Sequence, residues 1–332
     1  MKCLISHATA FEYWRLVGMS GIRVPKKSAA RVPPASASVR SIEKLAEVGL
    51  LSYPLHATTS RKAKRSKRAV YHYRPAPLPL GSIYLLGKDV AITSPELTLV
   101  QIASAFTTPE IAGLASEFCG FYSPLDGTMS GLVKRDRLAS TERLSSFLER
   151  AGKINGSQAA ARAVRYAFDR SRSPMETAIG LIMTLPRNYG GYAAQGAVVN
   201  QRVRLGAADR KATGRETLEP DILWPEGKVC VEYDSFEFHS DEWRTSNDAR
   251  RKNALLSAGY KTVTLTAKQA RSSNAMELVA RHVLKQQGKR QRIPDSERAL
   301  ALRVELLGSS SVLKNQYEPS RRLGQETRAT RR

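Results

Sequence analysis

The sequence is poor in cysteine and lacks long apolar runs. Its three cysteines, Cys3, Cys119 and Cys230, are odd in number, far apart and without a C-x-x-C pair. This pattern argues against a disulfide framework and against a zinc site built on thiolates. No run approaches the roughly 18 apolar residues that a membrane span needs, and the opening stretch MKCLISHATAFEYWR is not typical of a signal peptide. We therefore expect a cytoplasmic protein with no membrane partner.

Acidic residues are also in short supply. The chain has 332 residues, and its 53 Lys and Arg face 30 Asp and Glu, which gives a net charge of +23. Such an excess indicates a polyanionic partner, and DNA is the first candidate because neutralising phosphates releases condensed counterions. The alternative is that the charge serves solubility or lies in disordered basic ends. The charge alone says nothing about sequence specificity.

The chain divides into parts of different character. The sequence pattern of residues 1–170 predicts a mixed, mostly helical module. Its small β-portion includes AVYHY (69–73) and SIYLL (82–86). Residues 171–290 predict helices and strands in the order αβββαβα. Beyond about 305 the chain is polar and basic, and we expect 305–332 to be a disordered tail. The expected fold class is therefore α/β, with an α+β module at the N-terminus.

A basic run, RKAKRSKR, lies between two segments that look ordered. One interpretation is a loop that contacts phosphates, and the other is a solvated charged loop, which is the commoner case. Both interpretations stay open. The candidate nucleic-acid-binding residues of this run are Arg61, Lys62, Lys64, Arg65, Lys67 and Arg68.

Several of the acids gather in one short stretch of this basic chain. The segment PDILWPEGKVCVEYD, residues 220–234, predicts a β-hairpin with its turn in the middle. Side chains alternate between the two faces of a strand, so Glu232 and Asp234 share one face with Cys230. Carboxylates that lie close together repel one another, and they persist mainly where a cation neutralises them or where they do chemistry.

The register of this hairpin decides how close the acids lie. If Glu226–Gly227 is a two-residue loop, Asp221 lies directly opposite Glu232. If Pro225–Glu226 is the loop, the two acids are diagonal neighbours on the same face. Either register predicts two carboxylates that can share a hard divalent cation, Mg²⁺ or Mn²⁺. The alternative is a solvent-facing hairpin with scattered acids.

The combined pattern resembles a known family. P-D-x(10)-E-x-D, after a helix that bears a Glu, is similar to the PD-(D/E)xK, or restriction-endonuclease-like, superfamily. The closer resemblance is to its very-short-patch-repair-like branch of actinobacterial proteins, and it covers about residues 170–288. That branch carries an E-x-D strand, a His a few residues later, and a helix reading D-x-x-R-x-N-x-L-x-x-x-G-[WY]. The counterparts here are Glu232-Tyr233-Asp234, His239, and the stretch from Asp248 through Arg251, Asn253 and Leu255 to Gly259-Tyr260.

The resemblance implies a restriction-endonuclease-like αβββαβ core and a metal-dependent phosphodiesterase that acts on DNA. It implies that Asp221 and Glu232 are ligands of Mg²⁺ or Mn²⁺. The Lys that the family usually has two residues after the second acid is replaced by Asp234, a further candidate ligand. Arg251 or Lys252, on the next helix, is then the candidate for the positive group that orients water or stabilises charge on the phosphate.

Two other residues have competing interpretations. The family often places a metal-binding Glu on the first helix, and Glu176 occupies that place here. However, Ser173-x-x-Glu176 is also a capping box, in which the Glu reaches back to the start of the helix. His239 is a candidate general base or phosphate-polarising group, or else an ordinary loop residue.

A second function stays open beside the nuclease. The missing Lys favours a catalytically decayed nuclease fold that serves as a DNA-binding regulator. The front half of the chain is reminiscent of the N-terminal modules of abortive-infection-type antitoxin proteins. The alternative is therefore a regulatory or antitoxin-like protein that binds DNA without cleaving it.

Overall fold

The computed structural model shows a mixed α/β protein whose sheets combine parallel and antiparallel strands. The chain separates into two compact units, Met1–Ala167 together with the segment that starts at Val312, and Phe168–Ser311. No helix in the described part of the chain is long and apolar enough to cross a membrane. The structure describes residues 1–19, 21–37, 43, 51–64, 66–124, 131–234, 242–290, 292–308 and 311–313, with the backbone alone for 242–248.

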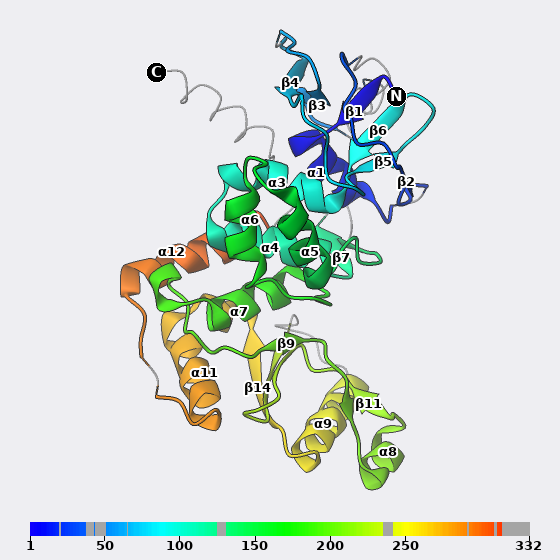
Figure 1. The fold of residues 1–332 in the computed structure, drawn as a ribbon. Coiled ribbons are helices and arrows are strands. Elements are labelled where there is room, and N and C mark those ends of the chain that lie inside the picture. The colour runs from blue at the N-terminus through cyan, green and yellow to red at the C-terminus, as the bar shows by residue number, and fades with distance from the viewer. Residues whose placement is uncertain are drawn as a thin grey trace. The chain divides into compact units, whose positions relative to one another are not determined.

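A six-stranded sheet forms one end of the first unit (Figure 1). The strand order is β2-β5-β6-β1-β3-β4, with β1–β6 and β3–β4 parallel and the other pairs antiparallel. The sheet is larger than the small β-portion expected, because β1 and β3 are buried along their whole length and carry no alternating pattern. The strands are β1 (Cys3–Ile5), β2 (Lys26–Lys27), β3 (Leu55–Thr59), β4 (Ala69–Tyr73), β5 (Ile83–Leu85) and β6 (Val90–Thr93).

Helices complete the first unit. Thr107 and Glu110 form a capping box at the start of α4, and Ser94 caps α3. Arg15 and Glu117 form a buried ion pair, with 2.6 Å between Nη2 and Oε2. The remaining elements are α1 (His7–Leu16), α3 (Pro95–Ile102), the 3-10 turn η1 (Ala103–Ala105), α4 (Thr108–Phe118), the hairpin β7 (Tyr122–Pro124) and β8 (Leu132–Lys134), α5 (Thr141–Ala151) and α6 (Ser157–Val164).

The expectation of a tail from 305 onward is wrong at its start. Residues 305–307 belong to helix α12 (Ser296–Leu307), where Leu306 and Leu307 are buried. Val312 and Leu313 are buried in the first unit, and Arg15 donates a hydrogen bond to the main-chain oxygen of Val312 at 2.6 Å. The apolar residues of this stretch therefore stabilise ordered structure. Residues 314–332 lie outside the described residues.

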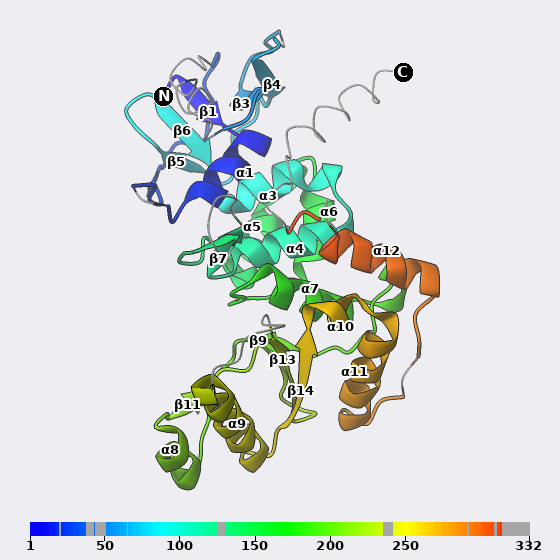
Figure 2. The same cartoon turned by 180° about the vertical axis from the view of Figure 1, so that it is seen from behind.

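A four-stranded mixed sheet forms the centre of the second unit, in the order β14-β13-β12-β9 (Figure 2). Helix α9 packs on one face, where Ala254 and Leu255 join a buried cluster with Leu223 and Cys230. Helix α11 lies on the other side of the sheet in Figures 1 and 2. The strands are β9 (Val198–Val199), β12 (Ile222–Trp224), β13 (Val229–Asp234) and β14 (Lys261–Thr266), and the helices are α7 (Pro174–Thr184), α9 (Glu242–Ser257) and α11 (Ser273–Gln286).

The end of α9 follows its sequence signal. Gly259 has φ of +86°, a left-handed conformation that glycine adopts without a Cβ penalty. Tyr260 N then donates to the oxygen of Leu255 at 2.8 Å, which closes the helix and leads into β14.

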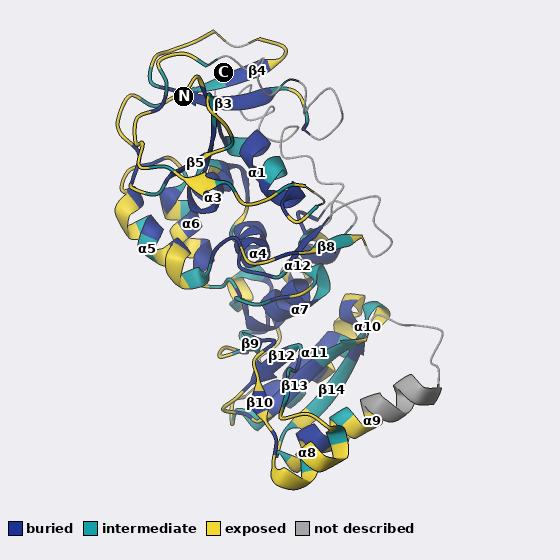
Figure 3. Ribbon diagram, turned by 90° about the vertical axis from the view of Figure 1, so that its right-hand side faces the viewer, coloured by how far each residue is buried: buried dark blue, intermediate teal, exposed yellow. Residues whose placement is uncertain are grey.

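The second unit is more interrupted than the expected αβββαβα order. The stretch 193–205 alternates in sequence like one strand, but Asn200 has φ of +50°, and the two strands on either side of it join different sheets. Figure 3 shows β12 as buried and α8 as mostly exposed. The elements outside the expected order are the 3-10 turn η2 (Arg187–Tyr189), β10 (Val203–Arg204), α8 (Ala207–Thr213), β11 (Thr217–Leu218), α10 (Ala267–Arg271) and α12.

Candidate functional site

The β12–β13 hairpin has the first of the two expected registers. Ile222 pairs with Val231 and Trp224 with Val229, and the amide of Lys228 donates to the oxygen of Pro225 at 3.2 Å. The turn is therefore centred on residues 226–227. One step beyond the last ladder pair, Asp221 faces Glu232 across the hairpin.

This register brings five of the predicted site residues to one cavity. The cavity has a volume of about 190 Å³. Thr264 and Tyr233 also line it, and neither was predicted. Thr264 lies beside Glu232 in the parallel β13–β14 ladder, so the strand pattern could have indicated it. The five predicted residues are Asp221, Glu232, Asp234, Arg251 and Lys252.

Asp221 is held firmly at the start of β12. The amide of Tyr233 donates to its Oδ2 at 2.7 Å, and the main-chain oxygen of Asp221 accepts from the amide of Asn200 at 3.1 Å. Burial raises the pKa of the Asp221 carboxyl, against the hydrogen bond from Tyr233 and the charges of Arg251 and Arg172. The side chain is therefore a carboxylate fixed in position but short of compensating charge.

Glu232 also has too little positive charge around it to balance its own. Its side chain is 15% exposed, and Arg251 Nη2 lies 3.1 Å from both of its oxygens. Burial, and then the negative charge of Asp221, raise the pKa of Glu232 to about 8, although Arg251 opposes the shift. A divalent cation between the two acids would favour their ionised forms. The pocket thus combines two acids whose charges one guanidinium does not fully balance.

Glu176 serves the start of α7. Ser173 Oγ accepts from the Glu176 amide at 3.2 Å, and the Glu176 carboxylate accepts from the amide of Arg172 at 2.9 Å and from Asn200 Nδ2 at 2.6 Å. This is a variant of the expected capping box, because the carboxylate reaches Arg172 rather than the Ser173 amide. Burial and the charge of Asp221 raise the pKa of Glu176 to about 7.

The fit to a metal ion is therefore limited to part of the predicted ligand set. Within the described ranges, no group of three or more His, Cys, Asp or Glu side chains could hold a metal ion as placed. Asp221 and Glu232 fit a cation by charge and by their common cavity, and Asp234 lines the same cavity. Glu176 does not line this cavity, and its oxygens are engaged at the helix start.

The remaining predicted residues are His239 and the basic run at 61–68. His239 is outside the described residues, and so is Arg65. Arg61, Lys64 and Lys67 are exposed on the connection between β3 and β4, in the first unit. In the same connection Lys62 Nζ lies 5.8 Å from the centre of the Tyr73 ring, and Arg68 lies 3.7 Å from Glu43.

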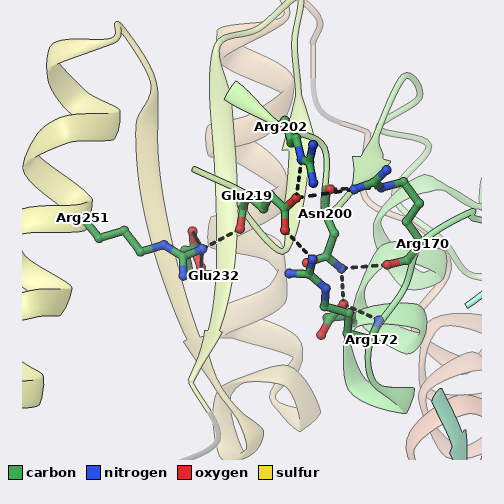
Figure 4. Close-up of polar contacts among 8 residues, drawn as sticks. Arg170, Arg172, Asn200, Arg202, Glu219, Glu232 and Arg251 are labelled. Atoms are coloured by element: carbon green, nitrogen blue, oxygen red, sulfur yellow. Dashed lines mark hydrogen bonds and ion pairs between the residues drawn. The ribbon is translucent and has the colours of Figure 1, made fainter. Parts of the chain in front are cut away.

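An arginine cluster near the pocket was not predicted. Arg170, Arg172 and Arg202 converge on the carboxylate of Glu219, two residues before Asp221 (Figure 4). Arg251 Nη2 also donates to the main-chain oxygen of Glu219 at 2.6 Å. The two closely spaced arginines at 170 and 172 are a weak sequence indication of a positively charged site. Nothing in the sequence shows that they lie beside residue 219.

Comparison with known proteins identifies no related protein. No family model matches the sequence, and no curated protein or solved structure is significantly similar to it. The functional argument therefore depends on the geometry of the pocket and on the residues that surround it.

Proposed function

We propose that the second unit is a metal-dependent DNA endonuclease with a restriction-endonuclease-like core, and that it hydrolyses phosphodiesters at the Asp221–Glu232 pocket. The observation that carries this proposal is the pair of partly buried carboxylates facing one cavity, both with a raised pKa. In a chain of net charge +23, two acids kept together without full compensation are typical of a cation site rather than of structural packing.

Asp221 and Glu232 would hold Mg²⁺ or Mn²⁺, and Asp234, which lines the same cavity, would be a further ligand. A bound divalent cation supplies charge stabilisation at the phosphate and lowers the pKa of water. The hydrogen bond from the Tyr233 amide orients the Asp221 carboxylate, so that its position does not depend on the ion.

Arg251 or Lys252 would supply the positive group that the family pattern has as a Lys and that this chain lacks. Both line the cavity from α9. Arg251 is held by the Glu219 oxygen at 2.6 Å, which keeps its guanidinium at the pocket. A guanidinium fixed there can pair with a nonbridging phosphate oxygen and stabilise the charge that grows on it.

The order of elements supports the proposed core. Helix α7, the β12–β13 hairpin, α9 and the parallel strand β14 follow one another around the pocket, as the resemblance implies. The extra pieces β10, α8 and β11 are inserted before β12 and leave the pairing of β12 and β13 unchanged.

A DNA-binding regulator is the second candidate function. It is favoured by Asp234 in place of the expected Lys and by the Arg251–Glu232 ion pair, which partly satisfies the pocket without any cation. In that case the acids would be a remnant of a decayed site, and the protein would bind DNA without cleaving it.

A cleavage assay separates the two candidates. Supercoiled plasmid, single-stranded DNA and mismatched duplex would each be incubated with the full chain and Mg²⁺ or Mn²⁺. We expect cleavage by the wild type and none by Asp221→Asn, with Glu226→Gln as the control because Glu226 is an exposed acid at the turn of the same hairpin. Unchanged cleavage in Asp221→Asn would refute the assigned site. No cleavage of any substrate by the wild type would favour the regulator.

A further inference from the structure

Three arginines of the second unit converge on one glutamate. Arg202 Nε lies 2.9 Å from Glu219 Oε1, Arg170 Nη2 lies 3.5 Å from the same oxygen, and Arg172 Nη2 pairs with Oε2. Figure 4 shows these guanidinium groups reaching Glu219 from different directions. Arg170 and Arg172 precede α7, Arg202 lies between β9 and β10, and Glu219 lies between β11 and β12.

The charges in this cluster do not balance. Three guanidinium groups face a single carboxylate, which leaves an excess of positive charge. The Arg170, Arg172 and Arg202 side chains are 39%, 47% and 70% exposed, whereas Glu219 is 20% exposed. Each guanidinium has several N–H donors, and contact with Glu219 uses few of them. The cluster therefore presents unused donors and net positive charge to solvent.

The Glu219 carboxylate is the anion that all three of these guanidinium groups contact. A carboxylate and a phosphate offer similar pairs of oxygens to the planar guanidinium fork. The Glu219 carboxylate thus has the charge and shape that a phosphate group would bring to the same donors.

The cluster adjoins the acidic pocket. Glu219 is separated from Asp221 by one residue, and Arg251 contacts both the Glu219 oxygen and the Glu232 carboxylate. The charge of Arg172 also acts on the Asp221 carboxyl. A nucleic-acid backbone that passes the pocket would place neighbouring phosphates within reach of the arginines.

We propose that Arg170, Arg172 and Arg202 form a binding site for backbone phosphates of DNA beside the Asp221–Glu232 pocket, and that the Glu219 carboxylate occupies this site until DNA displaces it. The inference rests on the proposed nuclease function for its substrate class. Glu219 then acts as an internal competitor that weakens binding while keeping the arginines in position.

The alternative is a purely structural cluster that joins three segments of the chain. The two interpretations differ in the sign of one result. If Glu219 competes with phosphate, Glu219→Gln frees the arginines and tightens DNA binding. If Glu219 only organises the segments, Glu219→Gln loosens them and weakens or does not change DNA binding.

The test is DNA affinity measured by fluorescence anisotropy with a labelled duplex of about 20 base pairs, in EDTA so that no cleavage occurs. We expect Glu219→Gln to bind about 3- to 10-fold more tightly than the full-length wild type. We expect Arg172→Ala and Arg202→Ala to bind about 5- to 20-fold more weakly and to reduce the salt slope by about 0.9 for each phosphate that is no longer neutralised. Arg187→Ala, which removes an exposed arginine on η2, is the matched control.

Thermal melts of each variant check folding, and Arg172→Lys separates loss of charge from loss of the guanidinium fork. If Arg172→Ala does not fold, Arg202→Ala and Glu219→Gln decide the question. Tighter binding by Glu219→Gln supports the phosphate site even if the wild type cleaves no DNA. The binding assay therefore tests this inference, and the cleavage assay tests the nuclease proposal. Weaker or unchanged binding by Glu219→Gln, or arginine variants equal to Arg187→Ala, overturns the inference.

Discussion

Arg251 bridges two parts of the second unit: its Nη2 lies 3.1 Å from both oxygens of Glu232 and 2.6 Å from the main-chain oxygen of Glu219. One nitrogen thus contacts the acidic pocket and the segment that carries the arginine cluster. In this position the guanidinium partly neutralises Glu232, as a cation would.

The first prediction concerns Arg251. Replacement by Ala removes the guanidinium that competes with a cation for Glu232, so we expect metal affinity to be unchanged or higher. We expect the cleavage rate to fall about 100-fold or more, because a fixed positive group at the phosphate is removed. Calorimetry with Mn²⁺ and a cleavage assay measure the two effects, and Arg251→Lys should recover part of the rate. Loss of metal binding would show that Arg251 instead holds the acids in place.

The second prediction distinguishes a cap from a metal ligand at Glu176. Glu176→Ala removes the acceptor of the Arg172 amide and one of the two acceptors of Asn200 Nδ2, and we expect it to lower the free energy of unfolding by about 1–3 kcal/mol. Glu176→Gln keeps one acceptor oxygen and should cost less. Urea denaturation measures both, and metal affinity in Glu176→Gln should stay within about 2-fold of wild type. A loss of metal binding in Glu176→Gln would restore the ligand interpretation.

Three histidines lie together in the first unit, where His56 is buried and His7 and His72 are partly buried. His56 Nδ1 lies 2.9 Å from His72 Nε2, and the His7 ring stacks on His72 with 3.3 Å between ring centres. Burial, and then the charge of His56, lower the pKa of His72 to about 3. Burial and both neighbours lower the pKa of His7 well below its usual value. The His7 and His72 rings are therefore neutral in the folded unit near neutral pH.

The third prediction follows from these values. The unfolded chain binds protons on His7 and His72 below about pH 6.5, whereas in the folded unit His72 stays neutral until about pH 3 and the pKa of His7 lies well below its usual value. The first unit should therefore be most stable above pH 6.5 and lose stability as the pH falls, by up to about 1.4 kcal/mol per pH unit for each histidine. Urea denaturation at pH 7.5 and 5.0 measures the loss, and His72→Gln should reduce it. Equal stability of the wild type at both pH values would contradict the burial of neutral rings.

The fourth prediction concerns the basic connection between β3 and β4. If this loop contacts phosphates, replacing Arg61, Lys64 and Lys67 by Gln should make the salt dependence of DNA binding shallower by about 0.9 for each phosphate that the loop neutralises. Anisotropy titrations between 50 and 200 mM salt, roughly the range over which such interactions matter, give the slope. An unchanged slope would identify the run as a solvated loop.

The sequence predicted the Asp221–Glu232 pocket better than it predicted the residues around that pocket. The turn chemistry of Pro225–Lys228 and the alternation of side chains narrowed the hairpin to two registers, and both put Asp221 and Glu232 on one face. Arg251 and Lys252 were selected by the resemblance of the following helix to the family pattern. These residues lie in consecutive elements, so their positions follow from short-range geometry.

The rest depends on contacts between distant segments. Nothing in the local pattern shows that Arg172 reaches Glu219, or that Asn200 supports Glu176, because tertiary folding brings these residues together. The left-handed Asn200 also interrupts a stretch that alternates like a continuous strand. In the first unit, β1 is three buried residues long and carries no periodic signal.

The central claim is that Asp221 and Glu232 form a divalent cation site. Calorimetric titration of the full chain with Mn²⁺ near pH 7.5 tests it without knowledge of the DNA substrate. We predict saturable binding by the wild type and by the hairpin-turn control Glu226→Gln, and loss of that binding in both Asp221→Asn and Glu232→Gln. No saturable heat in the wild type, or the same affinity in all four proteins, would contradict the claim.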